Sequence, residues 1–363
     1  MPTTPLAIPV EMQKPEAKLT HMPRIIKQMI TDSVKNVGTT LAISQMSKEF
    51  LALAKDSPTT LEKVTVQIAV DKLTVIKEAR FLKPVPDCYS QENSDPKKLV
   101  MEFSTHEDGV LMKNPTSNWQ KILPERDYRK AGVQYLLGTI GSKSTIKEFV
   151  LEVREPGNRP AAYPKAQFEE DRKVIMDEFE RLLRGFNHQL LVQSISFNIE
   201  VTEQQILKTL SYLQSGTLYH ICLSHNSPEI MPRRQNVLDI ERISETKQWK
   251  EASHLKITGY TCDFTSEKFA HFQDLQVHWT VAQKTLKAVI EIFFNRPKLE
   301  SLYVTSYRVF DYTGVKEYLR EFNPTKLKCR SDEMTVKMSL PNEPNTTINM
   351  SISSFEIFLT RSF

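Results

Sequence analysis

Cysteine is scarce in this chain, which contains four cysteines among 363 residues. They lie far apart, at Cys88, Cys222, Cys262 and Cys329, and show none of the short spacings that zinc sites use. This pattern excludes a zinc finger and a disulfide framework, and it fits a reducing compartment.

Long hydrophobic runs are missing too. No stretch approaches the roughly 18–20 apolar residues of a membrane-spanning helix, and the most apolar segment, 288–294, is interrupted by Glu291. The first twenty residues contain four prolines and no apolar core, which does not fit a secretory signal peptide. We therefore expect a cytoplasmic or nuclear protein with no membrane partner.

Positive charge is in small excess over negative charge, with a formal net charge of +4. Strong binding to phosphates requires basic residues that are concentrated on one surface. Lys326, Lys328 and Arg330 do form such a cluster near the C-terminus, but no aromatic residues for base stacking accompany it in the sequence. Nucleic acid is accordingly not an expected partner.

Motifs for catalysis and metal binding are absent as well. The glycine-rich stretch 138–144 lacks the spacing of a phosphate-binding loop. The eight histidines form no zinc-protease motif, and no serine has the flanking glycines of a nucleophile elbow. We predict a protein that is not an enzyme, with no catalytic, metal-binding or cofactor-binding residues and no cofactor.

A short repeat dominates the second half of the chain: an apolar residue, two others, an apolar residue, one other, and an apolar residue. Its seven copies are Ile146/Phe149/Leu151, Val192/Ile195/Phe197, Leu218/Ile221/Leu223, Ala252/Leu255/Ile257, Phe272/Leu275/Val277, Leu299/Leu302/Val304 and Pro324/Leu327/Cys329. Apolar stripes at helical spacing separate most copies, so the repeat predicts an α/β fold in which parallel strands and helices stack as a solenoid.

The rest of the chain divides by its hydrophobic period. Residues 1–20 are expected to form a disordered tail, and residues 21–57 a small helical unit. Residues 58–120 alternate with period two and predict an antiparallel β-meander. Residues 121–363 hold the strand–helix repeat, and its last part, from Ile348 to Leu359, predicts an antiparallel hairpin that covers the open edge of the stack.

Residues interleaved with the apolar triplets would lie on the opposite side of the sheet, because successive side chains in a strand alternate. They are nearly all polar and differ between copies, which suits a recognition surface. A solvent-facing sheet side is polar whether or not it binds anything, so that reading also stays open. The candidate target-binding residues are His220, His254, Lys256, Gln276, His278, Tyr303, Lys326, Lys328 and Arg330.

The short pattern resembles the strand segment of leucine-rich repeats, although the asparagine or cysteine that follows the strand in those repeats is present here only as Asn226. A closer resemblance rests on two motifs, Gln248-Trp249-Lys250-Glu251-Ala252 and Phe269-Ala270-His271-Phe272. They are similar to elements of the nematode F-box family whose members carry a C-terminal FTH domain. From the residues alone, Trp249 is expected to pack beneath the strand that follows Ala252.

What the resemblance implies is a ubiquitin-ligase adaptor. An F-box would bind the Skp-type linker protein of an SCF-type cullin–RING ligase, and the FTH domain would hold a target protein for ubiquitin-dependent degradation. The linker-binding positions carried over to this chain are Met22, Pro23, Ile25, Ile26, Met29, Ile43, Met46 and Phe50.

Two alternatives remain from the residues themselves. The apolar positions of the N-terminal unit could instead seal its helices onto the meander. The whole chain could also be a protein-interaction scaffold that works without a ligase, for example by docking on an RNA-regulatory protein.

Overall fold

The computed structural model describes most of the chain from Thr60 onward. The described residues are 60–69, 71–79, 97–117, 119–138, 140, 144–153, 165–185, 188–199, 201–224, 238–260, 267–278, 286–305, 315–322, 324–329, 333–340 and 343–363. The expected tail, the whole F-box-like unit and Arg330 lie outside these residues.

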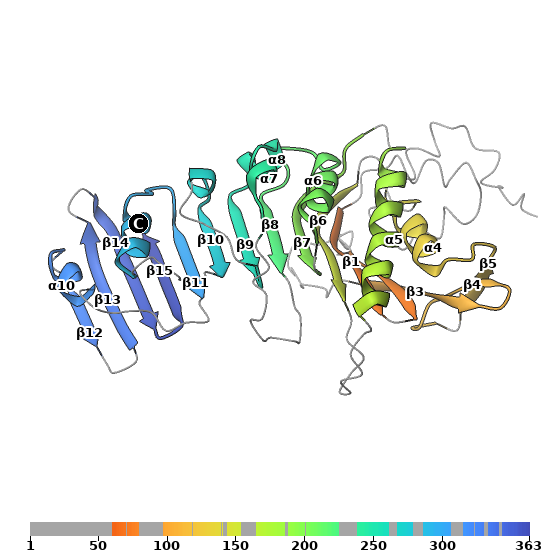
Figure 1. The fold of residues 1–363 in the computed structure, drawn as a ribbon, viewed down its shortest axis with the longest axis horizontal. Helices are drawn as coiled ribbons and strands as arrows, with labels where there is room; N and C mark the ends of the chain where they lie inside the picture. The colour runs from red at the N-terminus through yellow and green to blue at the C-terminus, as the bar shows by residue number, and fades with distance from the viewer. Residues whose placement is uncertain are drawn as a thin grey trace, which may run out of the picture.

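One sheet of fifteen strands runs along the long axis of the molecule (Figure 1). The strands pair in the order β12-β13-β14-β15-β11-β10-β9-β8-β7-β6-β1-β2-β3-β4-β5. Their bounds are β1 Thr60–Ala69, β2 Lys72–Ala79, β3 Lys97–His106, β4 Gly109–Lys113, β5 Gln120–Leu123, β6 Thr145–Val153, β7 Leu191–Asn198, β8 His220–Ser224, β9 His254–Thr258, β10 Asp274–His278, β11 Ser301–Thr305, β12 Lys326–Cys329, β13 Glu333–Leu340, β14 Glu343–Ser353 and β15 Glu356–Ser362.

The helices are short, apart from α5, and most of them connect successive strands. Their bounds are α4 Tyr128–Gly138, α5 Lys165–Leu183, α6 Glu203–Ser211, α7 Glu241–Ser244, α8 Lys247–Glu251, η2 Glu267–Phe269 (a 3-10 helix), α9 Leu286–Phe294 and α10 Val315–Arg320. A capping box formed by Thr202 and Gln205 begins α6. In the described part of the chain, no helix is both long and apolar enough to cross a bilayer.

The first six triplets lie side by side on six adjacent parallel strands, β6 to β11, as the repeat predicts. The two strand positions of each triplet form continuous rows across the sheet; in one row Phe149 pairs with Ile195, which pairs with Ile221. The rows continue through Leu255, Leu275 and Leu302 and through Ile257, Val277 and Val304. Both rows are buried, so the shared register follows from burying the same apolar positions in every copy.

The prediction that the seventh triplet lies beside the sixth was wrong. β12 does not pair with β11, because β15 pairs antiparallel with β11, and β14 and β13 separate β15 from β12. The apolar rows nevertheless continue across this insertion, with Leu302 opposite Leu359 and Leu327 opposite Val336. The expected hairpin is therefore present as β14–β15, but it lies between the sixth and seventh copies.

The β-meander shares the same sheet, since β1 pairs antiparallel with β2 and parallel with β6. Helix α4 packs closely against β2: a Cβ on Gly132 would lie 2.2 Å from Cδ2 of Leu73. Lys77 occupies an apolar-row position of β2, opposite Val64, and is buried with its ammonium 4.9 Å from the ring centre of Tyr135. Burial lowers the pKa of Lys77 to about 7.

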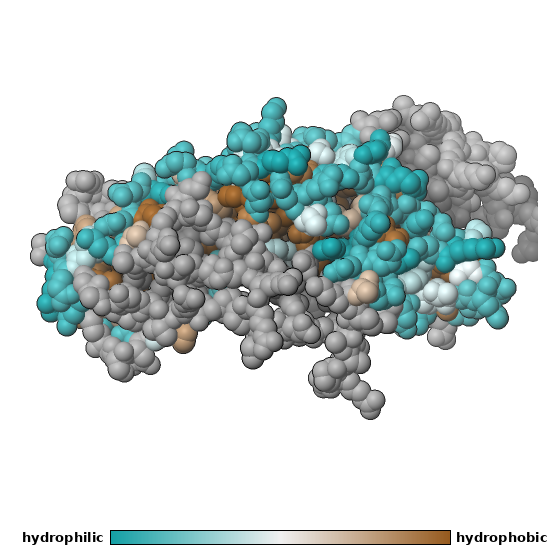
Figure 2. Space-filling model, in the orientation of Figure 1, coloured by the Kyte–Doolittle hydropathy of each residue, from teal (hydrophilic) through white to brown (hydrophobic). Residues whose placement is uncertain are grey.

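Helices cover the apolar side of the sheet. Phe179 of α5 packs edge-to-face on Phe149, with ring centres 6.0 Å apart. At the other end, Arg361 of β15 donates hydrogen bonds to the carbonyl oxygens of Phe293 and Phe294, the last residues of α9, where a cation is also favoured by the helix dipole. On the surface shown in Figure 2, hydrophilic residues predominate among those drawn in colour and hydrophobic residues form small patches between them.

Candidate binding surface

The side of the sheet opposite the helices carries rows of mainly polar residues, and we call it the polar face. Two rows cross the parallel strands. The histidine row consists of Lys63, Glu148, Ser194, His220, His254, Asp274 and Ser301. The tyrosine row consists of Thr65, Val150, Ser196, Cys222, Lys256, Gln276 and Tyr303. The register of the apolar triplets places these residues, because each apolar position fixes its polar neighbour.

The histidine row is a connected polar network. Ser194 Oγ lies 2.9 Å from His220 Nδ1, and His254 Nε2 lies 2.7 Å from Asp274 Oδ2. The rings of His220 and His254 pack edge-to-face with their centres 6.3 Å apart. Burial, with a further contribution from His254, lowers the pKa of His220, so this imidazole is neutral at pH 7.

Ser194 and His220 have the contact of a nucleophile and its base, but the serine is buried within the sheet. Ser194 is 7% exposed and lies in the middle of strand β7. A depression lined by Met176, Glu180 and Lys208 lies instead between α5 and α6, on the helix side. A hydroxyl held in this way positions the imidazole within the polar row.

Tyr303 is the last member of the tyrosine row on the parallel strands. Its hydroxyl donates a hydrogen bond of 2.8 Å to Glu356 of β15. Burial and this bond raise the pKa of Tyr303 to about 12, so the phenol remains protonated at physiological pH. His278 lies two residues after Gln276 on β10 and is buried. Its Nδ1 is 2.9 Å from Oγ1 of Thr305. Burial lowers the pKa of His278.

Exposure on the polar face is lowest in its middle, on β7 and β8, and Lys63 and Glu148 on the other side of these strands are partly exposed. Ser194, Ser196, Cys222 and Ser224 on β7 and β8 are buried. Residues of β9 to β11, including His254, Lys256, Gln276 and Tyr303, are partly exposed. One accessible part of the face therefore begins near β9 and continues onto the closing strands, and another lies at Lys63 and Glu148 on β1 and β6.

The structure brings together five of the predicted target-binding residues: His220, His254, Lys256, Gln276 and Tyr303 lie on neighbouring strands of this face. His278 shares the face but is buried. Lys326 and Lys328 are exposed on β12, four strands away from Tyr303 in the sheet order.

Sequence reasoning missed Phe358 and Phe355 as surface residues. Both are exposed, 44% and 49% respectively. The apolar side of β15 is formed by Ile357 and Leu359, which are buried, so Phe358 between them points to the polar face and lies opposite Tyr303. An aromatic residue between two aliphatic core residues was the available signal.

The two motifs behind the family resemblance contact each other on the helix side. Trp249 is fully buried, and its Nε1 donates a 3.0 Å hydrogen bond to the carbonyl of Lys268. Its ring packs edge-to-face on Phe269 and Phe272, with ring centres 5.7 and 5.2 Å away. Trp249 is buried, as expected, and its ring contacts join the two motifs.

A tyrosine after β9 bonds to the loop that follows β7. Tyr260 follows β9 in the chain. Its hydroxyl accepts a 3.0 Å hydrogen bond from the backbone amide of Val201, in the loop after β7. Tyr260 is buried, so one tyrosine satisfies loop backbone that lies two strands away in the sheet.

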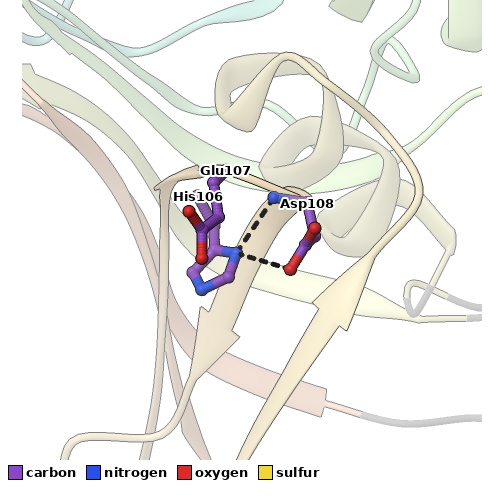
Figure 3. Close-up of side chains that lie close together, drawn as sticks. All are labelled: His106, Glu107 and Asp108. Carbon is purple, nitrogen blue, oxygen red and sulfur yellow. Dashed lines mark hydrogen bonds and ion pairs between the residues drawn. The ribbon is translucent and has the colours of Figure 1, made fainter.

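A second polar cluster lies at the turn between β3 and β4. His106, Glu107 and Asp108 bring possible ligand atoms within 4.8 Å of one another, and His106 Nδ1 accepts a hydrogen bond from the Asp108 amide (Figure 3). Glu107 and Asp108 are exposed. Adjacent residues of one turn make such a group by local geometry.

The fold and this surface define an α/β protein in which a repeated parallel strand presents a polar sheet face and helices cover the other side. Within it, residues 173–325 match the family model of the FTH domain. The match runs from α5 to the residue before β12 and includes both contacting motifs. A search of curated proteins finds no match to the chain.

Proposed function

We propose that this protein is a non-catalytic adaptor that holds a target protein on its polar face. The observation that carries the proposal is the shared register of β6 to β11, which sets varied polar side chains in rows over six strands. We take this part of the sheet as a leucine-rich-repeat-like solenoid, whose extended surface suits a macromolecular partner.

We further propose that the adaptor is the substrate-recognition subunit of an SCF-type cullin–RING ubiquitin ligase in the cytoplasm or nucleus. The FTH match at residues 173–325 supports this, together with the sequence resemblance to F-box proteins that carry the same domain. The N-terminal unit, residues 21–57, would bind the Skp-type linker protein through Ile26, Met46 and Phe50. Fold does not by itself specify function, so the linker is the part to test first.

Co-expression of the full chain with a Skp-type linker protein tests this assignment. We expect the two proteins to co-purify, and we expect the triple variant I26A/M46A/F50A to lose the linker while its circular dichroism spectrum stays unchanged. The triple variant K130A/K173A/K298A changes exposed lysines of the described region and should keep the linker. Failure of the folded wild-type chain to bind a linker would overturn the ligase role.

A chain that captures its target equally well after deletion of residues 1–55 would indicate recognition that does not depend on the N-terminal unit. If that deletion left the target's cellular half-life unchanged, the protein would be a ligase-independent scaffold.

A further inference from the structure

The C-terminal end of the polar face, formed by β11 to β15 (Figure 1), combines exposed aromatic and basic residues. The tyrosine row continues past Tyr303 through Phe358, Ser351 and Thr335 to Lys328. We call this continuation, with its neighbours Lys326 and Lys337, the aromatic–lysine surface.

An aromatic pair marks one side of this surface. Tyr303 and Phe358 are directly opposite on β11 and β15, and their rings pack edge-to-face with centres 6.2 Å apart. The hydrogen bond from Tyr303 to Glu356 holds the phenol in place, while Phe358 remains 44% exposed. A rigid, partly exposed aromatic pair is the kind of anchor that interface hot spots use.

Three lysines mark the other side. Lys326 and Lys337 are directly opposite across β12 and β13, and Lys328 lies two residues from Lys326 on the same face. All three are exposed, and none forms an ion pair with a described residue. Like charges directly opposite on adjacent strands destabilise a sheet, whereas an anionic partner would relieve that repulsion. Glu333 of β13 supplies one nearby carboxylate. Because three lysines outnumber it, this end still carries a net positive charge.

The strip between the two sides is neutral and able to form hydrogen bonds. It contains Ser351 and Asn349 on β14 and Thr335 on β13. Phe358 and Lys328 are separated by three strand spacings, or roughly 14 Å. An extended chain covers that distance with about four or five residues.

We infer that the aromatic–lysine surface binds an acidic segment of the target protein. The segment would place an apolar side chain against Tyr303 and Phe358 and, about four to five residues further along, carboxylates against the lysines. This deepens the proposed function and rests on it, since it names the chemistry of the target that the polar face would hold.

Single-stranded nucleic acid fits this surface less well, although aromatic and basic residues occur together. Glu356 lies beside the aromatic pair, and Asp274 lies on β10 next to β11. A nucleic acid would bring a phosphate near these carboxylates at every nucleotide, whereas a peptide carries its negative charge only where its acidic residues are.

Selection from a random twelve-residue peptide library on the full chain tests the inference. We expect enriched peptides to carry an aromatic or large aliphatic residue and, about four to five positions away, at least two acidic residues. A labelled copy of an enriched peptide should bind at least tenfold more weakly to K326E/K328E/K337E and to F358A, because the first reverses the charge and the second removes the anchor.

Two controls make the result specific. The variant K130E/K173E/K298E has the same charge change at exposed lysines of α4, α5 and the turn after α9, and it should bind the peptide as wild type does. A single-stranded oligouridine of twelve nucleotides should bind weakly and without dependence on Phe358.

The inference is overturned if enriched peptides lack acidic residues, if both triple lysine variants weaken binding equally, or if oligouridine binds tightly and loses affinity in K326E/K328E/K337E. The outcome is separate from that of the linker experiment, which depends on residues 21–57. Linker binding with a failed peptide selection would contradict only the inference, whereas peptide binding without linker binding would contradict only the ligase role.

Discussion

At the scale of single residues, the polar and apolar faces contain positions that break their own pattern. Lys77 is a lysine in an apolar row, buried beside Tyr135. Phe358 is an exposed aromatic residue in a polar row. Burying Lys77 costs stability, and its side chain contacts Tyr135 within the fold. Phe358 is exposed and available to a partner. Exposure therefore distinguishes the roles of these two residues.

Lys77 should make stability depend on pH. An unfolded lysine keeps its proton up to about pH 10.4, whereas burial lowers the folded pKa of Lys77 to about 7. Between these values the unfolded state binds more protons, so stability rises with pH across this range. The substitution Lys77→Met should therefore raise the free energy of unfolding at pH 7 by on the order of 1–3 kcal/mol.

Urea unfolding of wild type and K77M between pH 6.5 and 10 measures this effect. The advantage of K77M should be largest at the low end and shrink toward pH 10, where the folded lysine is neutral and the unfolded lysine begins to lose its proton. An advantage that did not change with pH would show that packing, and not the charge, sets the difference.

At the scale of elements, the sequence predicted what local burial determines and missed what distant pairing determines. The triplets repeat with a fixed spacing, so burying equivalent positions places β6 to β11 in register. The position of β15 between β11 and β12 depends on which strand edge it pairs with in the folded sheet. Residues 348–359 contain no local sequence pattern that predicts this pairing partner. Phe358 was missed for the same reason, since its neighbour Tyr303 comes from a different part of the chain.

The fit of α4 against β2 gives a prediction at this scale. Gly132→Ala should lower the free energy of unfolding by about 1–3 kcal/mol, because the added Cβ would meet the buried side chain of Leu73. Thermal unfolding of purified protein measures the change.

Gly138→Ala in the same helix is the matched control. A Cβ there meets no atom within 4 Å, so helix propensity alone acts, and the change should be neutral or stabilising by up to about 1 kcal/mol. Equal destabilisation by both substitutions would mean that helix α4 does not pack on β2 as the structure shows.

At the scale of the whole molecule, one long sheet has two sides of different composition. Its helix-covered side holds the apolar rows and the two FTH motifs around Trp249. Its other side becomes more exposed from β9 toward β12, where aromatic and basic residues occur together. This division supports an adaptor that binds through the sheet, and the candidate residues could be predicted from alternation alone, although their exposure could not.

Site-specific photo-crosslinking of the full chain in cells tests this account most directly. A benzophenone amino acid would replace Gln276 or Thr335 on the polar face, or Lys173 or Glu291 on the helix side. We predict a discrete crosslinked protein from the polar-face positions that disappears when K326E/K328E/K337E is combined with them, and none from the helix side. Crosslinked partners at Lys173 or Glu291 alone would contradict the account.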